Sequence, residues 1–319
     1  QLPPTVKTGT DSALSISLME RLAAALPRPE VSSRVDKTAK DQSYLDSLPI
    51  KQARSLMHAR SRRHEPSYRK RFAGSLLLSV QYRMHPSISA LPSAIFYDGL
   101  LATPEFMKEK RSFPEVLNRM MPSADPNVCV RMIDVGGRCN ERRGSPSKIS
   151  RTLFDKRKSL EEQTSYWNEP EAERVLSLIK VILSDGESGV QSIGVVTPYS
   201  AQVQLIKAMM ASDTEIKTLL LENSSVTIEV KSVDGYQGRE RDVVIFSAVR
   251  SNRNGNIGFL ADWRRLNVAL TRAKSGLLVV GDMETLREND KHWDAFAKWT
   301  SSIRCVVDDY DCPDDEASL

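Results

Sequence analysis

The chain has 319 residues and a formal net charge of +4, and 40% of its residues are hydrophobic, so it can bury one large core or two smaller ones. Its cysteines form no C-x-x-C pair, which argues against a zinc site or a disulfide framework. No apolar run reaches membrane-spanning length and no signal-peptide pattern opens the chain. We therefore expect a soluble intracellular protein, nuclear or cytoplasmic, without a metal site of its own and without membrane contact.

The N-terminal quarter predicts little packed structure. The chain begins at Gln1 without an initiator methionine, so we expect it to be a piece of a longer protein. Leucines at fourfold spacing predict an amphipathic helix over residues 12–26. The basic segment that follows, to about Gly74, lacks periodicity and reads as an insertion, more a solvated linker than a defined binding patch. Residues 308–316 form an acidic tail.

From Ser75 onward, short apolar runs alternate with helical patterns. Because the runs are rich in Val and Ile rather than alternating, they predict a parallel sheet covered on both faces, in a doubly wound α/β fold. Asn168 and Glu171 predict the start of a helix that ends near Leu183. The expected strands are 76–80, 128–135, 192–197, 226–230, 242–249 and 276–280, and the other expected helices are 86–96, 200–210 and 262–274.

The stretch from Asp262 to Lys274 is the strongest candidate for anion binding. As a helix it would bury Leu266, Ala269, Leu270 and Ala273 and would align Arg265 with Arg272 beside that face. Arginine holds phosphate oxygens through two parallel hydrogen bonds. An isolated helix of this kind would more often have a merely solvated basic face, but other stretches of the chain are also suited to phosphate.

Three further stretches lie between an expected strand and the next element. In residues 81–86 (QYRMHP), Arg83 could reach a phosphate and Tyr82 offers a flat face to a base, at what should be the carboxyl end of a strand. His85 reads as a structural hydrogen bonder, since no partner nucleophile is near. Alone, this hexapeptide could also be an ordinary turn.

The other two stretches are residues 232–240 (SVDGYQGRE) and 197–202 (TPYSAQ). In the first, Gly235 and Gly238 allow exposed amides, Glu240 suits ribose hydroxyls and Ser232 suits a nucleic-acid phosphate. In the second, a strand joins a helix, so its amides lie at a helix N-terminus, where Ser200 would serve as the N-cap. An irregular loop ended by glycines is the alternative for the first stretch, but a polar stretch of this length between buried strands favours a functional role. A plain helix cap is the alternative for the second.

Together and in this order, these stretches resemble the motifs of superfamily 1 helicases. Gln1-Leu2-Pro3-Pro4 looks like the end of motif III, and QYRMHP looks like motif IV. TPYSAQ is similar to the segment after it, VDGYQGRE to motif V and RRLNVALTRAK to motif VI. The resemblance is to the second RecA-like domain in the branch of the nonsense-mediated-decay helicase and senataxin.

The resemblance implies a division of the chain. Residues 1–10 would end a first RecA-like domain, 11–75 would hold the helix and the basic insertion, 76–307 would form the second RecA-like domain, and 308–319 the tail. ATP would bind between the two RecA-like domains of one polypeptide, with Mg²⁺, and both would be held mainly by the first.

The resemblance also implies roles for single residues. Gln1 would sense the γ-phosphate, and Arg83 and Arg272 would be arginine fingers. Tyr82 would stack on adenine, and Gly238, Glu240 and Arg265 would contact the rest of the nucleotide. The residues along the single strand would be Thr197, Pro198, Tyr199 and Ser232.

One feature departs from the family pattern. The chain has no G-x-x-x-x-G-K-[ST] phosphate loop and no apolar strand that ends in an Asp-Glu pair. It therefore supplies one wall of an ATPase site and should be inactive alone.

The implied function is that of a full-length helicase. It would move 5′-to-3′ on single-stranded RNA, which we prefer, or DNA, would unwind duplexes, and could use protein cofactors. A non-catalytic module for nucleic-acid or protein interaction that kept the fold is the alternative. A larger DNA-processing protein with a nuclease is a third possibility.

Overall fold

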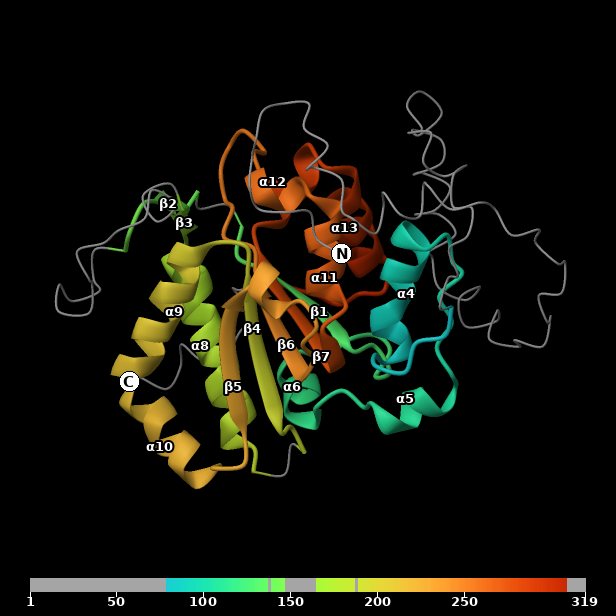
Figure 1. Ribbon diagram of the computed structural model, residues 1–319, viewed down its shortest axis with the longest axis horizontal. Coiled ribbons are helices and arrows are strands. Elements are labelled where there is room, and N and C mark those ends of the chain that lie inside the picture. The colour runs from blue at the N-terminus through green and yellow to red at the C-terminus, as the bar shows by residue number, and fades with distance from the viewer. Residues whose placement is uncertain (1–78, 137–138, 147–164, 187–188, 309–319) are drawn as a thin grey trace, which may run out of the picture.

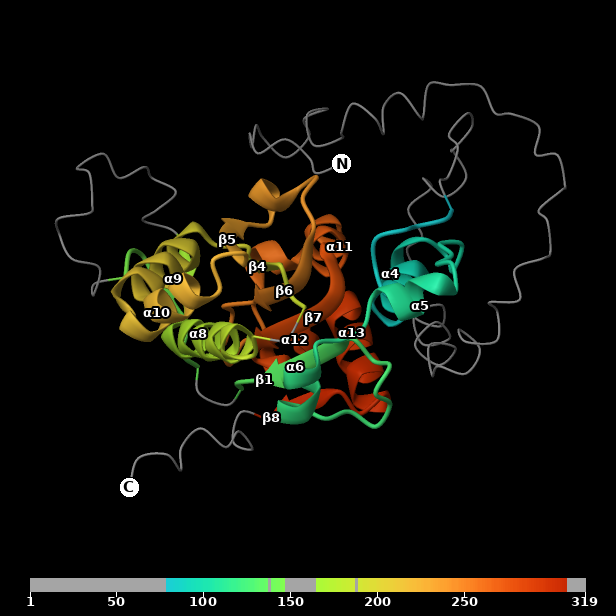
Figure 2. The same cartoon turned by 90° about the horizontal axis from the view of Figure 1, so that it is seen from below.

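Six parallel strands form the centre of the fold in the computed structural model, which describes residues 79–136, 139–146, 165–186 and 189–308. Helices cover both faces of this sheet, as Figures 1 and 2 show in two perpendicular views. The architecture confirms the predicted doubly wound, RecA-like α/β class. In spatial order the strands are β5 (Thr227–Ser232), β4 (Ser192–Thr197), β6 (Arg241–Ser247), β7 (Ala273–Gly281), β1 (Val130–Asp134) and β8 (Val306–Asp308).

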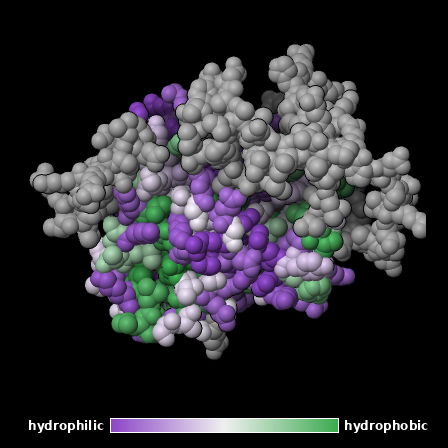
Figure 3. All heavy atoms as spheres, viewed as in Figure 1, coloured by the Kyte–Doolittle hydropathy of each residue, from purple (hydrophilic) through white to green (hydrophobic). Residues whose placement is uncertain are grey.

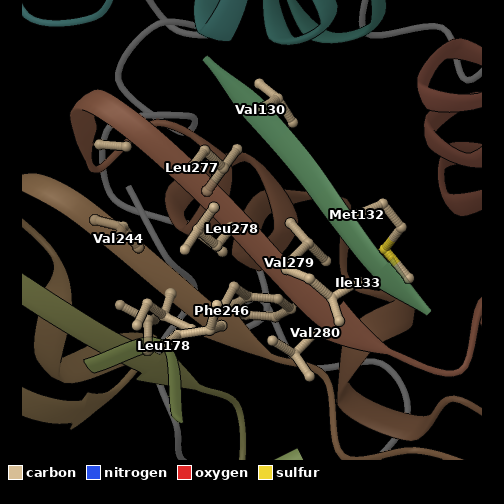
Figure 4. Packing of buried hydrophobic residues seen from close by; sticks show 14 of the residues in the cluster. Val130, Met132, Ile133, Leu178, Val244, Phe246, Leu277, Leu278, Val279 and Val280 are labelled. Atoms are coloured by element: carbon tan, nitrogen blue, oxygen red, sulfur yellow. The ribbon is translucent and has the colours of Figure 1, made fainter. Parts of the chain in front are cut away.

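The apolar strands pack as a sheet buried on both faces. Val244 and Phe246 of β6 are fully buried, as are Leu278 and Val280 of β7. Figure 4 shows these side chains meeting those of β1 and Leu178 of the neighbouring helix. Because both faces are covered, the strand sequences are continuously apolar, as the sequence indicated.

Helix ends follow the local capping signals in several places. The side chain of Asn168 accepts a hydrogen bond from Glu171 N and starts α8, as predicted. In α13, Trp293, Phe296 and Trp299 are buried and pack in the core. The helices are α4 (Pro86–Phe96), α5 (Phe106–Lys110), α6 (Glu115–Met120), α8 (Glu169–Ser184), α9 (Ser200–Ser212), α10 (Thr214–Glu222), α11 (Trp263–Leu270), α12 (Met283–Glu288) and α13 (Lys291–Ser302), with the 3-10 helices η3 (Asp234–Tyr236) and η4 (Gly258–Ala261).

Two segments outside the main sheet were not anticipated. Strand β2 (Arg142–Arg143) pairs antiparallel with β3 (Tyr166–Trp167) in a short ribbon. The hydroxyl of Ser165, next to β3, accepts a hydrogen bond from Ala201 N and so caps α9. The prediction that Ser200 is the N-cap was therefore wrong, because the cap comes from another part of the chain.

The predicted arginine helix is shorter than its apolar spacing suggested. α11 ends at Leu270, and Ala273 and Lys274 belong to β7, where Ala273 pairs with Arg241 of β6. Arg272 thus lies in the connection after the helix, not on the helix beside Arg265. The helix ends before Ala273 because this residue pairs with β6. Ala273 is as well buried in the sheet as it would be on the apolar face of a longer helix.

The described end of the first predicted strand, which was expected over residues 76–80, lies outside the main sheet. Val80 is 46% exposed and forms only an isolated bridge to Ala102. Residues 76–78 lie outside the described residues, as do Gln1, the helix predicted over 12–26, the basic insertion and most of the acidic tail.

All six strands run in the same direction, so the sheet has one amino edge and one carboxyl edge. Glu240 and Arg272 precede β6 and β7 and lie at the amino edge, while Thr197 and Ser232 end β4 and β5 at the carboxyl edge. Hydrophobic surface gathers over α10, where Leu221 is 82% exposed (Figure 3). The residues singled out by sequence are therefore divided between two opposite edges.

Candidate functional site

A cluster of charged side chains lies at the amino edge of the sheet. Arg83 Nε donates to Glu240 Oε2 at 2.6 Å, and Arg83 Nη1 donates to the carbonyl oxygen of Thr271 at 3.0 Å. These contacts join parts of the chain that are 157 and 188 residues apart. The sequence predicted that residues 81–86 would lie at a carboxyl end, which was wrong, because Val80, at the described end of the strand expected before them, forms only an isolated bridge to Ala102, and Arg83 contacts residues at the amino edge.

Arg272 reaches the same residue as Arg83. Its Nη2 donates to the Thr271 hydroxyl at 2.7 Å and its Nε donates to the Val268 carbonyl at 2.9 Å. Burial, and then the nearby charge of Arg83, lower the pKa of Arg272 to about 10. Among the described residues no carboxylate lies within ion-pair distance of its guanidinium. Arg272 therefore stays charged at neutral pH, half-buried and ready to attract an anion.

Glu240 balances only part of the positive charge in the cluster. Its hydrogen bond from Arg83 is the main reason that its pKa lies below the usual range. Lys274 Nζ lies 3.7 Å from Glu240 Oε1 and 3.5 Å from Asp242 Oδ1. Three cations thus face two carboxylates, so the cluster as a whole favours a bound anion.

Gln81 organises the turn that carries Arg83. Its Oε1 accepts hydrogen bonds from Arg83 N and Met84 N, both at 2.8 Å, and its Nε2 donates to Thr103 Oγ1 at 2.6 Å. No role for Gln81 was predicted from the sequence, although a glutamine at the start of a turn can satisfy several backbone groups at once. The turn is therefore held by side-chain hydrogen bonds instead of by a strand.

Two other residues of this turn, Tyr82 and His85, differ in how far their side chains are exposed. Tyr82 is 63% exposed, and its ring is stacked with that of Phe106, with centroids 6.4 Å apart. His85 is buried, and its Nδ1 accepts a hydrogen bond from Ser87 N at the start of α4. As expected, His85 is a structural hydrogen bonder, whereas Tyr82 presents a flat aromatic surface to solvent.

The stretch from Ser232 to Glu240 connects the two edges of the sheet. It leaves β5 at the carboxyl edge and enters β6 at the amino edge, with β4 between these strands. Its Tyr236 is fully buried against Gly194 of β4, where an added Cβ would lie 2.3 Å from the Tyr236 hydroxyl. Gly238 has φ +80°, a left-handed conformation that suits glycine, with open space around it. The amides on either side of it, of Gln237 and Arg239, donate to the carbonyls of Asp234 and Tyr236, so the open space next to the charged cluster lies at Gly238 itself.

The four residues expected along a nucleic-acid strand lie together at the carboxyl edge. Thr197 and Ser232 are direct neighbours across β4 and β5. However, Thr197 is fully buried and Tyr199 is 2% exposed, and the Tyr199 hydroxyl donates to the Ile257 carbonyl at 3.3 Å. Pro198 and Ser232 are half-buried. Of these four described residues, only Pro198 and Ser232 offer side-chain surface to a ligand.

Arg265 has partners of its own, separate from those of Arg83 and Arg272. Its Nε and Nη2 donate to the two carboxylate oxygens of Asp234 at 3.1 and 3.2 Å. This paired geometry ties α11 to η3 and occupies the face of the guanidinium that would grip a phosphate. Arg265 is therefore bound to a carboxylate, whereas Arg272 has only hydrogen-bond acceptors.

A group of polar residues around Glu141 lies at the carboxyl edge, and no pattern in the sequence predicted it. Glu141, next to β2, accepts hydrogen bonds from Arg250 Nε at 2.9 Å, Ser251 N at 2.9 Å and Asn252 Nδ2 at 2.9 Å. Because Glu141 is 109 residues from Arg250, the pairing could not be read from spacing. These hydrogen bonds hold the segment that follows β6 against the short ribbon formed by β2 and β3.

The described residues contain no group of three or more His, Cys, Asp or Glu side chains able to hold a metal ion. Nor does any helix in the described ranges have the length and apolar character needed to cross a membrane.

Comparisons with known proteins agree with this arrangement. The family model described as an AAA domain matches residues 53–284. The chain is 35% identical to helicase sen1 of Schizosaccharomyces pombe over 69% of this chain and 11% of that protein. It is 36% identical to the regulator of nonsense transcripts 1 homolog of Arabidopsis thaliana over 72% of this chain and 16% of that protein.

A further relative is the DNA polymerase alpha-associated DNA helicase A of Schizosaccharomyces pombe, 36% identical over 72% of this chain and 31% of that protein. The chain thus spans between a tenth and a third of the length of these three relatives. The family match over residues 53–284 includes the charged cluster at the amino edge and the polar residues at the carboxyl edge.

Proposed function

The chain belongs to the superfamily 1 helicases of the nonsense-mediated-decay and senataxin type, and from this premise we propose that it forms one side of the ATP-binding site of an ATP-dependent helicase. The whole protein would hydrolyse ATP, move 5′-to-3′ along a single strand and unwind duplexes. In the division we propose, residues 76–307 are the second RecA-like domain and residues 1–10 end the first. Residues 11–75 then form a connecting segment with the basic insertion, and 308–319 a tail.

The convergence of Arg83 and Arg272 on Thr271 is the observation that carries this proposal. In phosphoryl transfer, negative charge spreads over the oxygens of the γ-phosphoryl group, and an arginine finger stabilises that charge. Arg272 suits this role because its guanidinium is anchored by three hydrogen bonds, to the Val268 and Arg239 carbonyls and the Thr271 hydroxyl, and has no described carboxylate partner. Arg83 would act beside it once a phosphate replaces Glu240 at its Nε.

The remaining nucleotide contacts would surround the two arginines. Tyr82 would stack on adenine, supported by its exposed ring. Gly238 would contact the phosphates and Glu240 would accept from the ribose. Arg265 would act through Asp234, which it already binds, and would orient η3 rather than grip a phosphate directly.

The other wall of the site would come from a first RecA-like domain of the same polypeptide. The chain has no phosphate-loop sequence, and its described residues hold no metal-binding group. We therefore propose that this domain binds the ATP phosphates and Mg²⁺, and that Gln1 senses the γ-phosphate from that side. When bound, Mg²⁺ would neutralise charge on the phosphate oxygens.

At the carboxyl edge, Pro198 and Ser232 would contact the single strand directly. Thr197 and Tyr199 would shape the same surface from beneath, because their side chains are buried. RNA remains our preferred strand, since the similarity includes a regulator of nonsense transcripts and a putative ATP-dependent RNA helicase of Saccharomyces cerevisiae. The DNA helicase among the relatives keeps DNA as the second substrate to test. Protein cofactors would add to these partners.

The test is Arg272→Ala in the full-length protein. Nucleic-acid-stimulated ATP turnover should fall about 10³- to 10⁵-fold, because the arginine acts on charge that develops in the transition state. Strand binding, measured by fluorescence anisotropy, should be retained. Arg272→Lys should not rescue turnover, since a single ammonium cannot both bond to Val268 and Thr271 and reach a phosphate.

Arg287→Ala is the matched control, because Arg287 is exposed and pairs only weakly with Asp294 at 3.7 Å; its turnover should equal that of the wild type. Unchanged turnover in Arg272→Ala would refute the finger role. A full-length protein without any ATPase would instead favour the non-catalytic module. The chain alone should show no ATPase above background.

A further inference from the structure

Thr271 lies between the two arginines of the charged cluster and contacts both of them. Its carbonyl oxygen accepts a hydrogen bond from Arg83 Nη1 at 3.0 Å, and its hydroxyl oxygen accepts one from Arg272 Nη2 at 2.7 Å. The two guanidiniums carry like charges and repel each other, so they stay side by side only if other groups hold them. Thr271 supplies an acceptor to each.

The hydroxyl of Thr271 is oriented to accept from Arg272. Its oxygen lies 2.6 Å from the carbonyl oxygen of Asn267 and 3.4 Å from that of Val268, both one turn earlier in α11. A hydroxyl has a single proton and a carbonyl oxygen can only accept, so this proton points toward the helix. The lone pairs of the hydroxyl oxygen are therefore directed to the guanidinium. Removal of the hydroxyl would leave a partly buried N–H of Arg272 without its acceptor.

The backbone on both sides of Thr271 is fixed by regular structure. Thr271 N donates to the Asn267 carbonyl at 3.2 Å at the end of α11, and the Arg272 carbonyl accepts from Arg241 N at 3.1 Å beside β6. Thr271 itself is only 6% exposed. Such rigid support matters because catalytic groups act only when they are held close to the productive geometry.

We propose that Thr271 is a positioning residue for ATP hydrolysis, which aims Arg272 through its hydroxyl and Arg83 through its carbonyl. The inference rests on the proposed function and assigns a role to a residue that acts only through the two arginines. Because the arginines act on charge that develops in the transition state, a change at Thr271 should affect kcat more than the KM for ATP.

The experiment measures nucleic-acid-stimulated ATP turnover of Thr271→Val and Thr271→Ser in the full-length protein. Valine has the shape of threonine without the hydroxyl, so kcat should fall about 10- to 100-fold, as expected for the loss of one hydrogen bond to a charged group. The KM for ATP and the affinity for a single strand should stay close to those of the wild type. Serine keeps the hydroxyl and should restore turnover.

A double-variant measurement separates positioning from a general effect on the fold. In an Arg272→Ala background, Thr271→Val should cause little further loss of kcat, because the group through which the hydroxyl acts is already gone. Two independent effects would multiply instead. Thermal melting of each variant checks that it is folded at the assay temperature.

Thr300→Val is the matched control. The Thr300 hydroxyl in α13 also donates to the carbonyl four residues earlier, that of Phe296, at 3.0 Å. Its second described partner is the carbonyl of Ala297 in the same helix. Both valine variants therefore lose a hydroxyl bonded to its own helix, but only Thr271→Val should lower kcat.

Wild-type kcat in Thr271→Val, or an equally low kcat in Thr271→Ser, would overturn the positioning role, while a loss of turnover in Arg272→Ala would still support the proposed function. An equal fall in kcat for Thr300→Val would also overturn it, because the loss would then come from the fold. Unchanged turnover in Arg272→Ala would overturn the proposed function together with this inference.

Discussion

Glu171 should make the stability of this chain depend on pH in an unusual direction. Its carboxylate is fully buried at the start of α8 and accepts hydrogen bonds from Ser247 Oγ at 2.7 Å, Val249 N at 2.8 Å and Asn168 Nδ2 at 3.2 Å. These donors favour the charged form. Burial outweighs them and raises the pKa of Glu171 from 4.5 to about 8.

The sign follows from proton linkage. Below pH 4.5 both the folded and unfolded chains carry the proton on Glu171, so folding is not affected. Between pH 4.5 and about 8 the unfolded chain has lost this proton and the folded chain keeps it. The free energy of unfolding should therefore fall by about 1.4 kcal/mol per pH unit, and by about 5 kcal/mol in total.

Glu171→Gln tests this reasoning. Glutamine cannot ionise, so the variant should lose the fall in stability between pH 5 and pH 8. Its amide would face the Asn168 amide, which costs about 1–3 kcal/mol at every pH. The variant should thus be less stable than the wild type at the acidic end and more stable at the alkaline end.

The assay is urea unfolding of the chain at a series of pH values. Glu173→Gln, two residues along the same helix and exposed, should follow the wild-type profile. Parallel profiles for the wild type and Glu171→Gln, without a crossing, would show that the buried carboxyl does not keep its proton as argued.

Two further substitutions test the packing and the acid response. Gly194→Ala should destabilise the chain by about 1–3 kcal/mol, because the new methyl would meet Tyr236; equal unfolding midpoints for it and for Gly186→Ala, where the space is open, would contradict this. Burial lowers the pKa of His85 to about 4, so the stability it contributes is complete above pH 6.5 and is lost as pH falls toward 4. His85→Asn should keep the helix cap on Ser87 and unfold less steeply in acid; a thermal melting profile identical to that of the wild type from neutral pH to pH 4 would contradict this role.

Sequence signals from neighbouring residues correctly predicted those helix ends that such residues set. Asn168 started α8 as expected, because an N-cap acts on the amides three residues away. The spacing of Leu266, Ala269 and Leu270 correctly predicted which face of α11 is buried. It could not predict where the helix ends, since Ala273 is buried equally well in a strand. The site residues of the motifs were found from their order along the chain, and their roles remain predictions.

The amino-acid sequence by itself determined the α/β class, the family and the presence of charged stretches, because apolar periodicity and motif order are properties of neighbouring residues. Only the tertiary structure decided which of those stretches meet. It joined Arg83 to Thr271 and Glu240, paired Arg265 with Asp234, and separated the amino edge from the carboxyl edge of the sheet. Strand order is set by packing between distant segments, and so the division of one motif series into two sites could not be read from spacing.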